Sequence, residues 1–362
     1  MSEAAGPHAA AIAALLLGTA LASALLTALA TAYARRRRLL DLPGRRRSHA
    51  QATPRGGGIG IVLVVVLAAA LWWPLRSEAW ALVAALVLVA GVGWIDDHGG
   101  LAARWRLLAH GVAAALWLAP LVAGFWRGAC QFPLGMDCDG LHLVIAALAL
   151  LVGVGLVWSI NLHNFMDGIN GLAACQAAFV FAVAALAFAH AGSMPRAVGS
   201  ATLLAATVGF IPFNFPRASV FLGDVGSGAL GLMIGIVVLL LSLAPGIAAA
   251  SGLLACSGFV VDASCTLASR MLRGRRWYSA HREHLYQWLV RTGLSHARVV
   301  ALYMAWNVVI VVPALLWINR PRAHAGGSGV MLGVYALGVG LWLVGKRWCL
   351  RRVASGGADA TA

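Results

Sequence analysis

The residues with the clearest chemical potential are two adjacent acids, Asp96 and Asp97, at the end of an apolar stretch. Two neighbouring carboxylates can bind a hard cation, or one can act as a general base while the other binds the cation. Arg104 and Arg106 follow shortly after and could hold a phosphate group. Taken alone, the motif is also compatible with a solvated helix end.

A second polar motif lies at residues 161–173 and combines amides, one acid and two glycines. The glycines would let the backbone approach a ligand, and the N-terminus of the helix expected next would favour an anion. A plain turn between two helices is the alternative interpretation. The candidate residues in this motif are Asn164, Asp167 and Asn170.

A third motif places Asp224 among small residues at the start of an expected helix, shortly after Asn214 and Phe221. A carboxylate in this position could hold Mg²⁺ while nearby backbone amides face a phosphate. An aspartate that only caps the helix would have the same pattern.

Two basic segments complete the candidates. In residues 270–298, arginines suit a pyrophosphate, and histidines can hydrogen-bond to it or act as acids. A purely topological or lipid-headgroup role for the arginines is the alternative. Residues 41–58 are weaker evidence, because a Gly-rich stretch could cradle a phosphate or simply be flexible. The candidates in the first segment are His281, Arg282 and His284.

Composition decides the class of protein. Of 362 residues, 61% are hydrophobic and 11% are charged, and the formal net charge is +15. Soluble domains carry about 25% charged residues, and disordered chains are poor in apolar residues. The net charge would suit a nucleic-acid binder, but the apolar body does not. We therefore predict an all-α polytopic integral membrane protein with no nucleic-acid partner.

Eleven apolar stretches have roughly the length of about 20 residues that crosses a bilayer. Of the 27 Lys and Arg residues, 22 fall on one side of this arrangement, which the positive-inside rule makes cytoplasmic. We thus expect one transmembrane domain over residues 1–362, with the N-terminus outside and a basic cytoplasmic tail at 346–362. The stretches are 9–33, 59–74, 80–95, 107–123, 142–160, 172–191, 198–213, 226–243, 248–268, 299–319 and 329–345. The cytoplasmic loops expected to form the active site are 34–58, 96–106, 161–171, 214–225 and 269–298.

From about Asp41 to His284, five motifs in order resemble those of the polyprenyl-phosphate N-acetylaminosugar-1-phosphate transferases, glycosyltransferase family 4. The resemblance implies transfer of an N-acetylaminosugar 1-phosphate from a UDP-sugar to undecaprenyl phosphate, with release of UMP. It implies Mg²⁺ as cofactor, with Mn²⁺ as a substitute. It also implies a multi-pass protein of the bacterial inner membrane, in contact with membrane lipids, with its active site on the cytoplasmic face. A homodimer is left open.

The resemblance also implies roles for individual residues. Asp224 matches the magnesium ligand, with Asp97 as a second ligand, and Asn170 stands where many members have a second aspartate. The implied catalytic residues are Asp96, Asp97, Asp167, His281 and His284. The implied substrate-binding residues are Asn164, Asn170, Asn214, Phe221, Arg104, Arg106 and Arg282.

The His-Arg-Glu-His segment is more similar to the branch that initiates O-antigen and transfers GlcNAc 1-phosphate than to the triple-histidine form of the muramoyl-pentapeptide transferases. That second branch is the alternative function. A membrane transporter of lipids or sugar phosphates would need polar residues deep in several spans, and only Asp262 qualifies; it could instead pair with Arg270 or Thr266. A CDP-alcohol phosphotransferase would need more acids at helical spacing than residues 167–170 supply.

Overall fold

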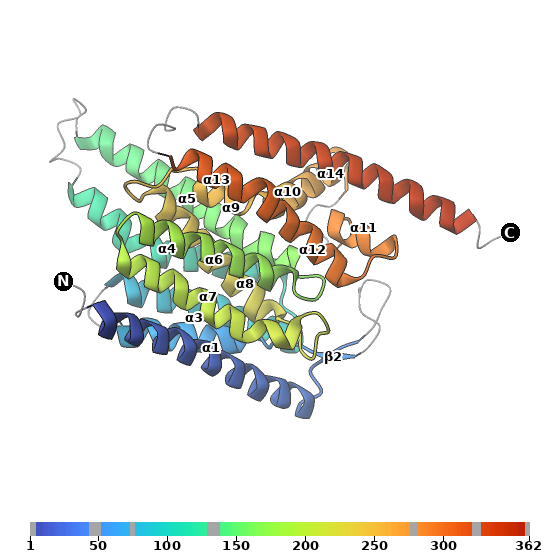
Figure 1. Ribbon diagram of the computed structural model, residues 1–362, viewed down its shortest axis with the longest axis horizontal. Helices are drawn as coiled ribbons and strands as arrows, with labels where there is room; N and C mark the ends of the chain where they lie inside the picture. Colours follow the sequence, from blue (N-terminus) through green and yellow to red (C-terminus); the bar gives the residue numbers. More distant parts are fainter. Residues whose placement is uncertain are drawn as a thin grey trace.

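The computed structural model describes residues 5–42, 52–72, 77–128, 138–275, 281–320 and 327–358. Helices make up nearly all of this part of the chain (Figure 1). The first half contains α1 (Ala5–Arg36), β1 (Leu40–Asp41), β2 (Thr53–Pro54), α2 (Ile59–Trp72), α3 (Ser77–Gly99), α4 (Ala103–Gly128), α5 (Cys138–Met166) and α6 (Leu172–His190). The second half contains α7 (Met194–Asn214), α8 (Gly223–Ser242), α9 (Ser251–Ala255), α10 (Ser257–Leu272), α11 (Leu285–Arg291), α12 (His296–Trp306), the π-helix η2 (Asn307–Val311), α13 (Val312–Ile318) and α14 (Gly327–Ala358).

The predicted all-α membrane fold is confirmed. Within the described residues, nine helical segments are long and apolar enough to cross a membrane, and one of them is the continuous run α12–η2–α13. The other two expected stretches are also helical but differ from simple spans. Helix α2 has only 14 residues, and the stretch at 248–268 divides into α9 and α10 at Cys256. The predicted orientation of the termini stays a prediction.

Two expected loops are partly helical. Asn161 and Asn164 belong to the last turns of α5, which ends only at Met166. The acids Asp96 and Asp97 likewise lie within the last turn of α3. The described part of the expected basic tail, 346–358, continues α14 as a helix, which extends beyond the rest of the bundle (Figure 1).

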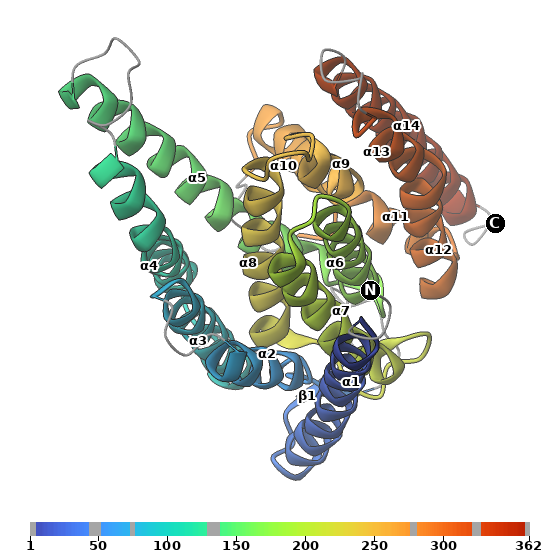
Figure 2. The same cartoon turned by 60° about the vertical axis from the view of Figure 1, so that its left-hand side comes forward.

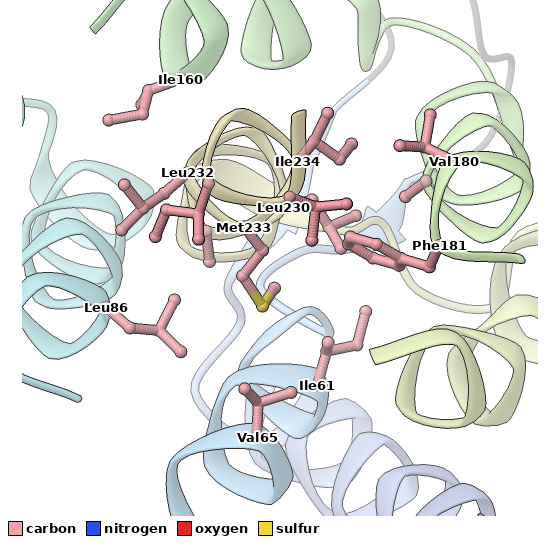
Figure 3. Close-up of a cluster of buried hydrophobic side chains, with 14 of the residues drawn as sticks. Ile61, Val65, Leu86, Ile160, Val180, Phe181, Leu230, Leu232, Met233 and Ile234 are labelled. Atoms are coloured by element: carbon pink, nitrogen blue, oxygen red, sulfur yellow. The ribbon is translucent and has the colours of Figure 1, made fainter. Parts of the chain in front are cut away.

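Helix α8 is the axis of the bundle. Thirteen of its 20 residues are buried, whereas only 11% of the most apolar stretch of α1 and of α5 is buried. Leu230, Leu232 and Met233 point from α8 toward different neighbouring helices (Figure 3). Helices α3, α4 and α5 form a wall on one side of α8, and α12, α13 and α14 lie on the far side of α9 and α10 (Figure 2). The N-terminal end of α8 is thus held from several directions.

Glycines bring the backbones of α3, α5 and α8 into direct contact. A Cβ atom added to Gly93 of α3 would lie 2.5 Å from the backbone of Asp224, and one added to Gly231 would lie 2.7 Å from Cα of Ile160. Small residues that let backbones approach are typical of helix packing in membranes, where the hydrophobic effect between helices is weak. Gly93 therefore sets the distance between the acidic end of α3 and the start of α8.

A short backbone ladder closes the same end of the bundle. Strands β1 and β2 pair antiparallel, and the chain after β2 continues along residues 221–222. The Gly57 and Gly58 amides donate to the carbonyls of Phe221 and Leu222, each at 2.9 Å, and the Phe221 amide donates to Pro54 at 2.8 Å. The Gly-rich segment is consequently part of the support of α8.

We predict that Gly93→Ala lowers the free energy of unfolding by about 1–3 kcal/mol, because the new methyl group must displace the backbone of α8. Gly91→Ala, two residues away on the same helix, is the control, since nothing lies within 4 Å of its added Cβ. Thermal unfolding of both variants in detergent provides the comparison. Equal midpoints for the two variants would contradict the close approach.

Candidate functional site

Asp97 holds the N-terminus of α8. Its two carboxylate oxygens accept hydrogen bonds from the amides of Asp224, at 3.1 Å, and Val225, at 3.2 Å. Arg55 lies 3.9 Å from Asp97 Oδ1 through Nε and also donates to the Asp97 carbonyl. The Asp97 side chain is only 4% exposed. Since amides already occupy both oxygens, the clearest role of Asp97 in this geometry is to orient Asp224.

Asp224 lies at the centre of a polar network that joins the four helices α3, α4, α5 and α8. Asn164 donates to Asp224 Oδ1 at 2.7 Å and to Ser227 Oγ at 2.9 Å. Arg106 donates to Asp96 at 2.6 Å and reaches Asp224 Oδ2 at 3.5 Å. Asp96 also accepts from the Leu101 amide. Arg106 therefore connects the two acids from α3 and α8 and holds them at one place.

Asp167, in the turn between α5 and α6, adds a further carboxyl group. Burial raises the pKa of Asp167 well above its usual range, and the charges of Asp224 and Asp97 raise it further. Four carboxyl groups from three parts of the chain thus lie near one another: Arg106 contacts those of Asp96 and Asp224, Arg55 lies next to Asp97, and Asp167 is close enough to feel the charges of Asp224 and Asp97. Such an excess of negative charge favours binding of a cation.

The donor set fits Mg²⁺. No three His, Cys, Asp or Glu side chains form a ready metal-binding group within the residues that the structure describes. Magnesium does not require one, because it usually takes one or two carboxylates and fills its other positions with waters and substrate phosphates. Asp224, partly exposed, is the carboxylate best placed for this role, and the carboxyl group of Asp167 lines the same cavity.

Three of the clustered acids, Asp97, Asp167 and Asp224, line a cavity of about 240 Å³ at one end of the bundle. It brings together Asp97, Asn164, Asp167, Asn170, Asn214, Phe221 and Asp224, all of which the sequence motifs singled out. A second, smaller cavity of about 40 Å³ shares Asn164 and Asp224 with it and continues between α3, α4 and α5. Arg106 and His110 line that second cavity, where His110 Nδ1 lies 3.3 Å from Asn161 Nδ2.

Two of the amides support the cavity walls in different ways. Asn214 accepts from the Gly171 amide at 2.7 Å and donates to the Val220 carbonyl at 3.0 Å, so its side chain connects two loops. Asn170 donates to the Pro216 carbonyl at 3.3 Å, while its buried Oδ1 has no hydrogen-bond partner among the residues that the structure describes. Asn170 therefore keeps a free acceptor for a ligand, whereas Asn214 already uses both ends of its amide.

The histidine segment lies beside the cavity rather than in its wall. The rings of His281 and His284 stack with centroids 5.0 Å apart. Burial, followed by repulsion between the two rings when both are protonated and by the charge of Arg270, lowers the pKa of His281 to about 4, and burial also lowers the pKa of His284. Both rings are consequently neutral at pH 7. In this state each can donate or accept a hydrogen bond without adding positive charge.

Asp262 fixes the position of this segment. It accepts hydrogen bonds from the Leu285 and Tyr286 amides at 2.7 and 3.3 Å, which open α11. Three side chains from α10, α12 and α14 also donate to it, at 2.7–3.2 Å: Thr266, Tyr303 and Trp342. The expected pairing with Thr266 is confirmed, while Arg270 instead pairs with Glu283.

Contacts of α11 and α14 connect the segment around His281 and His284 to the rest of the site. Tyr286 donates to the Phe165 carbonyl at 2.9 Å, next to the turn that carries Asp167. Lys346 of α14 donates to the carbonyl of Glu283, and Arg275 pairs with the Glu283 carboxylate at 3.0 Å. The last helix of the chain therefore takes part in holding the histidine segment.

Some residues of the site were not singled out from the sequence, and some predicted ones lie elsewhere. Gln287 and His296 line the cavity. His296 Nδ1 accepts a hydrogen bond from the backbone N–H of Asn170 at 3.3 Å. The Gln287 side chain accepts from the His284 amide at 3.3 Å, a contact typical of the third residue of a helix. Arg104 is exposed, with its guanidinium 5.5 Å from the ring of Trp105. Arg282 is half-buried and outside the lining of the main cavity.

Comparison with known proteins shows to which family the chain belongs. Residues 79–242 match the family model described as Glycosyl transferase family 4. The chain is 30% identical over 348 residues to the decaprenyl-phosphate N-acetylglucosaminephosphotransferase of Mycobacterium leprae (strain TN), which covers 84% of this chain and 82% of the relative. The chain belongs to glycosyl transferase family 4. The family is the one that the five motifs resemble.

Further relatives of this family-4 protein carry the same name. The enzyme of Mycolicibacterium smegmatis (strain ATCC 700084 / mc(2)155) is 33% identical over 308 residues, which cover 75% of this chain and 73% of the relative. The enzyme of Mycobacterium tuberculosis (strain ATCC 25618 / H37Rv) is 31% identical over 343 residues, which cover 82% and 80%. The four clustered aspartates lie within the matched family segment, and the histidine segment lies after it.

We predict that Asp262→Ala lowers the free energy of unfolding by at least about 3 kcal/mol, because several buried donors lose their acceptor. The control Thr266→Val removes only the 3.2 Å hydrogen bond and should cost about 1 kcal/mol or less. Denaturant or thermal unfolding in detergent measures both. The anchoring role would be wrong if the two variants were equally stable.

Proposed function

We propose that this chain transfers N-acetylaminosugar 1-phosphate from a UDP-sugar to undecaprenyl phosphate, releases UMP and initiates a cell-envelope polysaccharide. The observation that carries the proposal is the carboxylate cluster around Asp224 at the junction of two cavities. The names of the relatives favour N-acetylglucosamine as the sugar and a polyprenyl phosphate as the acceptor. The names of the relatives therefore favour a GlcNAc-1-phosphate transferase over a muramoyl-pentapeptide transferase. No observation favours a transporter of lipids or sugar phosphates.

The larger cavity suits the nucleotide sugar. The aromatic ring of Phe221 can stack on a base, and the free acceptor of Asn170 can take a hydrogen bond from a base N–H group. Gln287 and His296 extend the same wall with further polar groups. The diphosphate would then lie toward Asp224, where a bound divalent cation would offset its negative charge.

The smaller cavity suits the phosphate of the lipid. It is lined by Arg106, whose guanidinium lies between Asp96 and Asp224, and it continues between membrane-spanning helices. An oxygen of the lipid phosphate attacks the phosphorus next to the sugar, and the bond from that phosphorus to the bridging oxygen of UMP breaks. Asp96 would accept any remaining proton of the lipid phosphate, while Arg106 orients it. We favour this direct attack over a covalent aspartyl intermediate.

A divalent cation held by Asp224, with Asp167 or Asp97 nearby, would neutralise charge on the diphosphate and on the leaving UMP. Mg²⁺ is the proposed cofactor, and Mn²⁺ a substitute. The proposed location is the inner membrane of a bacterium with this site on the cytoplasmic face, as the distribution of basic residues indicates.

Substitution of Asp224 tests the proposal. Purified protein in detergent receives undecaprenyl phosphate, Mg²⁺ and a panel of UDP-N-acetyl sugars, and UMP release is measured. We expect Asp224→Asn to lower the turnover at least about 100-fold, because the cation loses a charged ligand. Asp139→Asn is the control, since Asp139 is exposed at the opposite end of α5. Near-normal turnover of Asp224→Asn would contradict the metal assignment, and no UMP release with any sugar would contradict the reaction class.

Removal of the metal gives a separate prediction. Chelation of divalent cations should stop UMP release, and Mg²⁺ or Mn²⁺ should restore it, whereas Ca²⁺ at equal concentration should restore less because it prefers larger coordination shells. Turnover that persists in excess chelator would contradict a cation requirement.

A further inference from the structure

Helix α2 is shorter, over its described residues, than a typical membrane-spanning helix. Its 14 residues have a length of about 21 Å at 1.5 Å per residue, whereas the hydrocarbon core of a bilayer is about 30 Å thick. The helix begins at Ile59, beside the catalytic cavity, so its end at Trp72 falls in the half of the bundle away from that cavity. Its neighbours α3, α7 and α8 are longer, with 23, 21 and 20 residues.

A second large cavity lies in this half of the bundle, with a volume of about 380 Å³. Its walls come from α2, α3, α4, α6, α7 and α8, and most of its lining is apolar. The side chains of Met233 and Val65 point toward one another between α8 and α2 (Figure 3). Representative lining residues are Val65, Leu82, Trp117, Phe188, Met233 and Val237.

This cavity is separate from the catalytic one. The lining residues of α8 run from Met233 to Leu240, about 14–24 Å along the helix from Asp224. Along α3 and α8, between the residues that line the two sites, Leu86 and Leu230 are at most 1% exposed. A lipid whose phosphate lies at Asp224 would therefore have no direct path to this space through the bundle.

One cationic side chain lines the cavity. Arg196, in the first turn of α7, is exposed, and no ion pair of Arg196 occurs within the described ranges of the chain. Its guanidinium lies 5.9 Å from the ring of Phe188, another lining residue. This positive charge is at the membrane face opposite the catalytic cavity, because α7 ends at that cavity with Asn214 and begins here.

We propose that this cavity binds one hydrocarbon chain of an anionic phospholipid from the leaflet opposite the catalytic site, with the lipid phosphate at Arg196. An apolar cavity in a membrane protein favours an alkyl chain, and the guanidinium fits a phosphate through paired hydrogen bonds. A free phosphate ion would leave the apolar walls without a partner, and a neutral lipid would leave Arg196 without one. The bound chain lies against α2, whose residues Val65, Ala68 and Ala69 line the cavity.

Binding to the folded state alone should stabilise the protein. The protein in detergent receives dioleoyl phosphatidylglycerol or, separately, dioleoyl phosphatidylethanolamine, and both thermal midpoint and bound lipid by native mass spectrometry are measured. We expect phosphatidylglycerol to raise the midpoint and to remain bound as a single molecule. Phosphatidylethanolamine should do so about tenfold more weakly, because its headgroup ammonium offsets the phosphate charge.

Matched variants locate the site. Arg196→Gln should weaken phosphatidylglycerol binding about tenfold, and Val237→Trp, which fills the cavity, should abolish it. Arg127→Gln is the control, since Arg127 is an exposed arginine at the same membrane face, in the last turn of α4 and outside the cavity lining. If Val237→Trp does not fold, Val237→Phe replaces it. Equal binding by Arg196→Gln and Arg127→Gln, or unchanged binding by the cavity-filling variant, would overturn the proposal. Neither readout depends on UMP release.

Discussion

The candidate site depends first on one interaction, the capping of α8 by the Asp97 carboxylate. The start of a helix leaves backbone amides without partners, and here a buried acid from another helix accepts two of them. This interaction determines where Asp224 stands relative to α3. The backbone ladder from Gly57 and Gly58 holds the same end of α8 from the other side. Asp224 therefore has a defined position before any ligand arrives.

A second buried carboxylate, Asp262, has the same structural task for α11. Both acids exchange their water shell for backbone amides and a few side chains, which is how a charge can be buried in a membrane protein without a high cost. The two caps orient different walls of one cavity. An acid in this chain can therefore have one of two tasks. Some acids face the cavity, and others, such as Asp97 and Asp262, hold the helices that carry the cavity walls.

Chemistry-bearing motifs were the most predictable part of the structure. Asp167 and Asp224 were expected in one site, because both stand in loops predicted on the same side of the membrane and both match motifs of the family. Asn214 has the same sequence signature, yet its amide connects two loops, because a polar side chain in a loop can satisfy backbone groups as well as a ligand. Gln287 and His296 could not be assigned in this way, since only tertiary packing brings α11 and α12 to the cavity.

The fold was predictable in class but not in every length. Hydropathy identifies residues 59–74 as apolar, but it does not tell where the helix ends, and α2 is short. Hydropathy also gives no sign that the apolar stretch 248–268 divides into two helices at Cys256. In contrast, α1 and α5 agree well with expectation, because long continuous apolar helices at the edge of a bundle need little tertiary information.

The contacts of α14 have a practical consequence for work on this protein. Trp342 and Lys346 connect the last helix to Asp262 and to the Glu283 carbonyl, so a truncation before them would release the histidine segment. From Arg351 to Ser355 every side chain is exposed, and the helix extends beyond the bundle there. A rigid fusion partner for electron cryomicroscopy is therefore best joined as a continuous helix after Ser355, where it adds mass without disturbing the core.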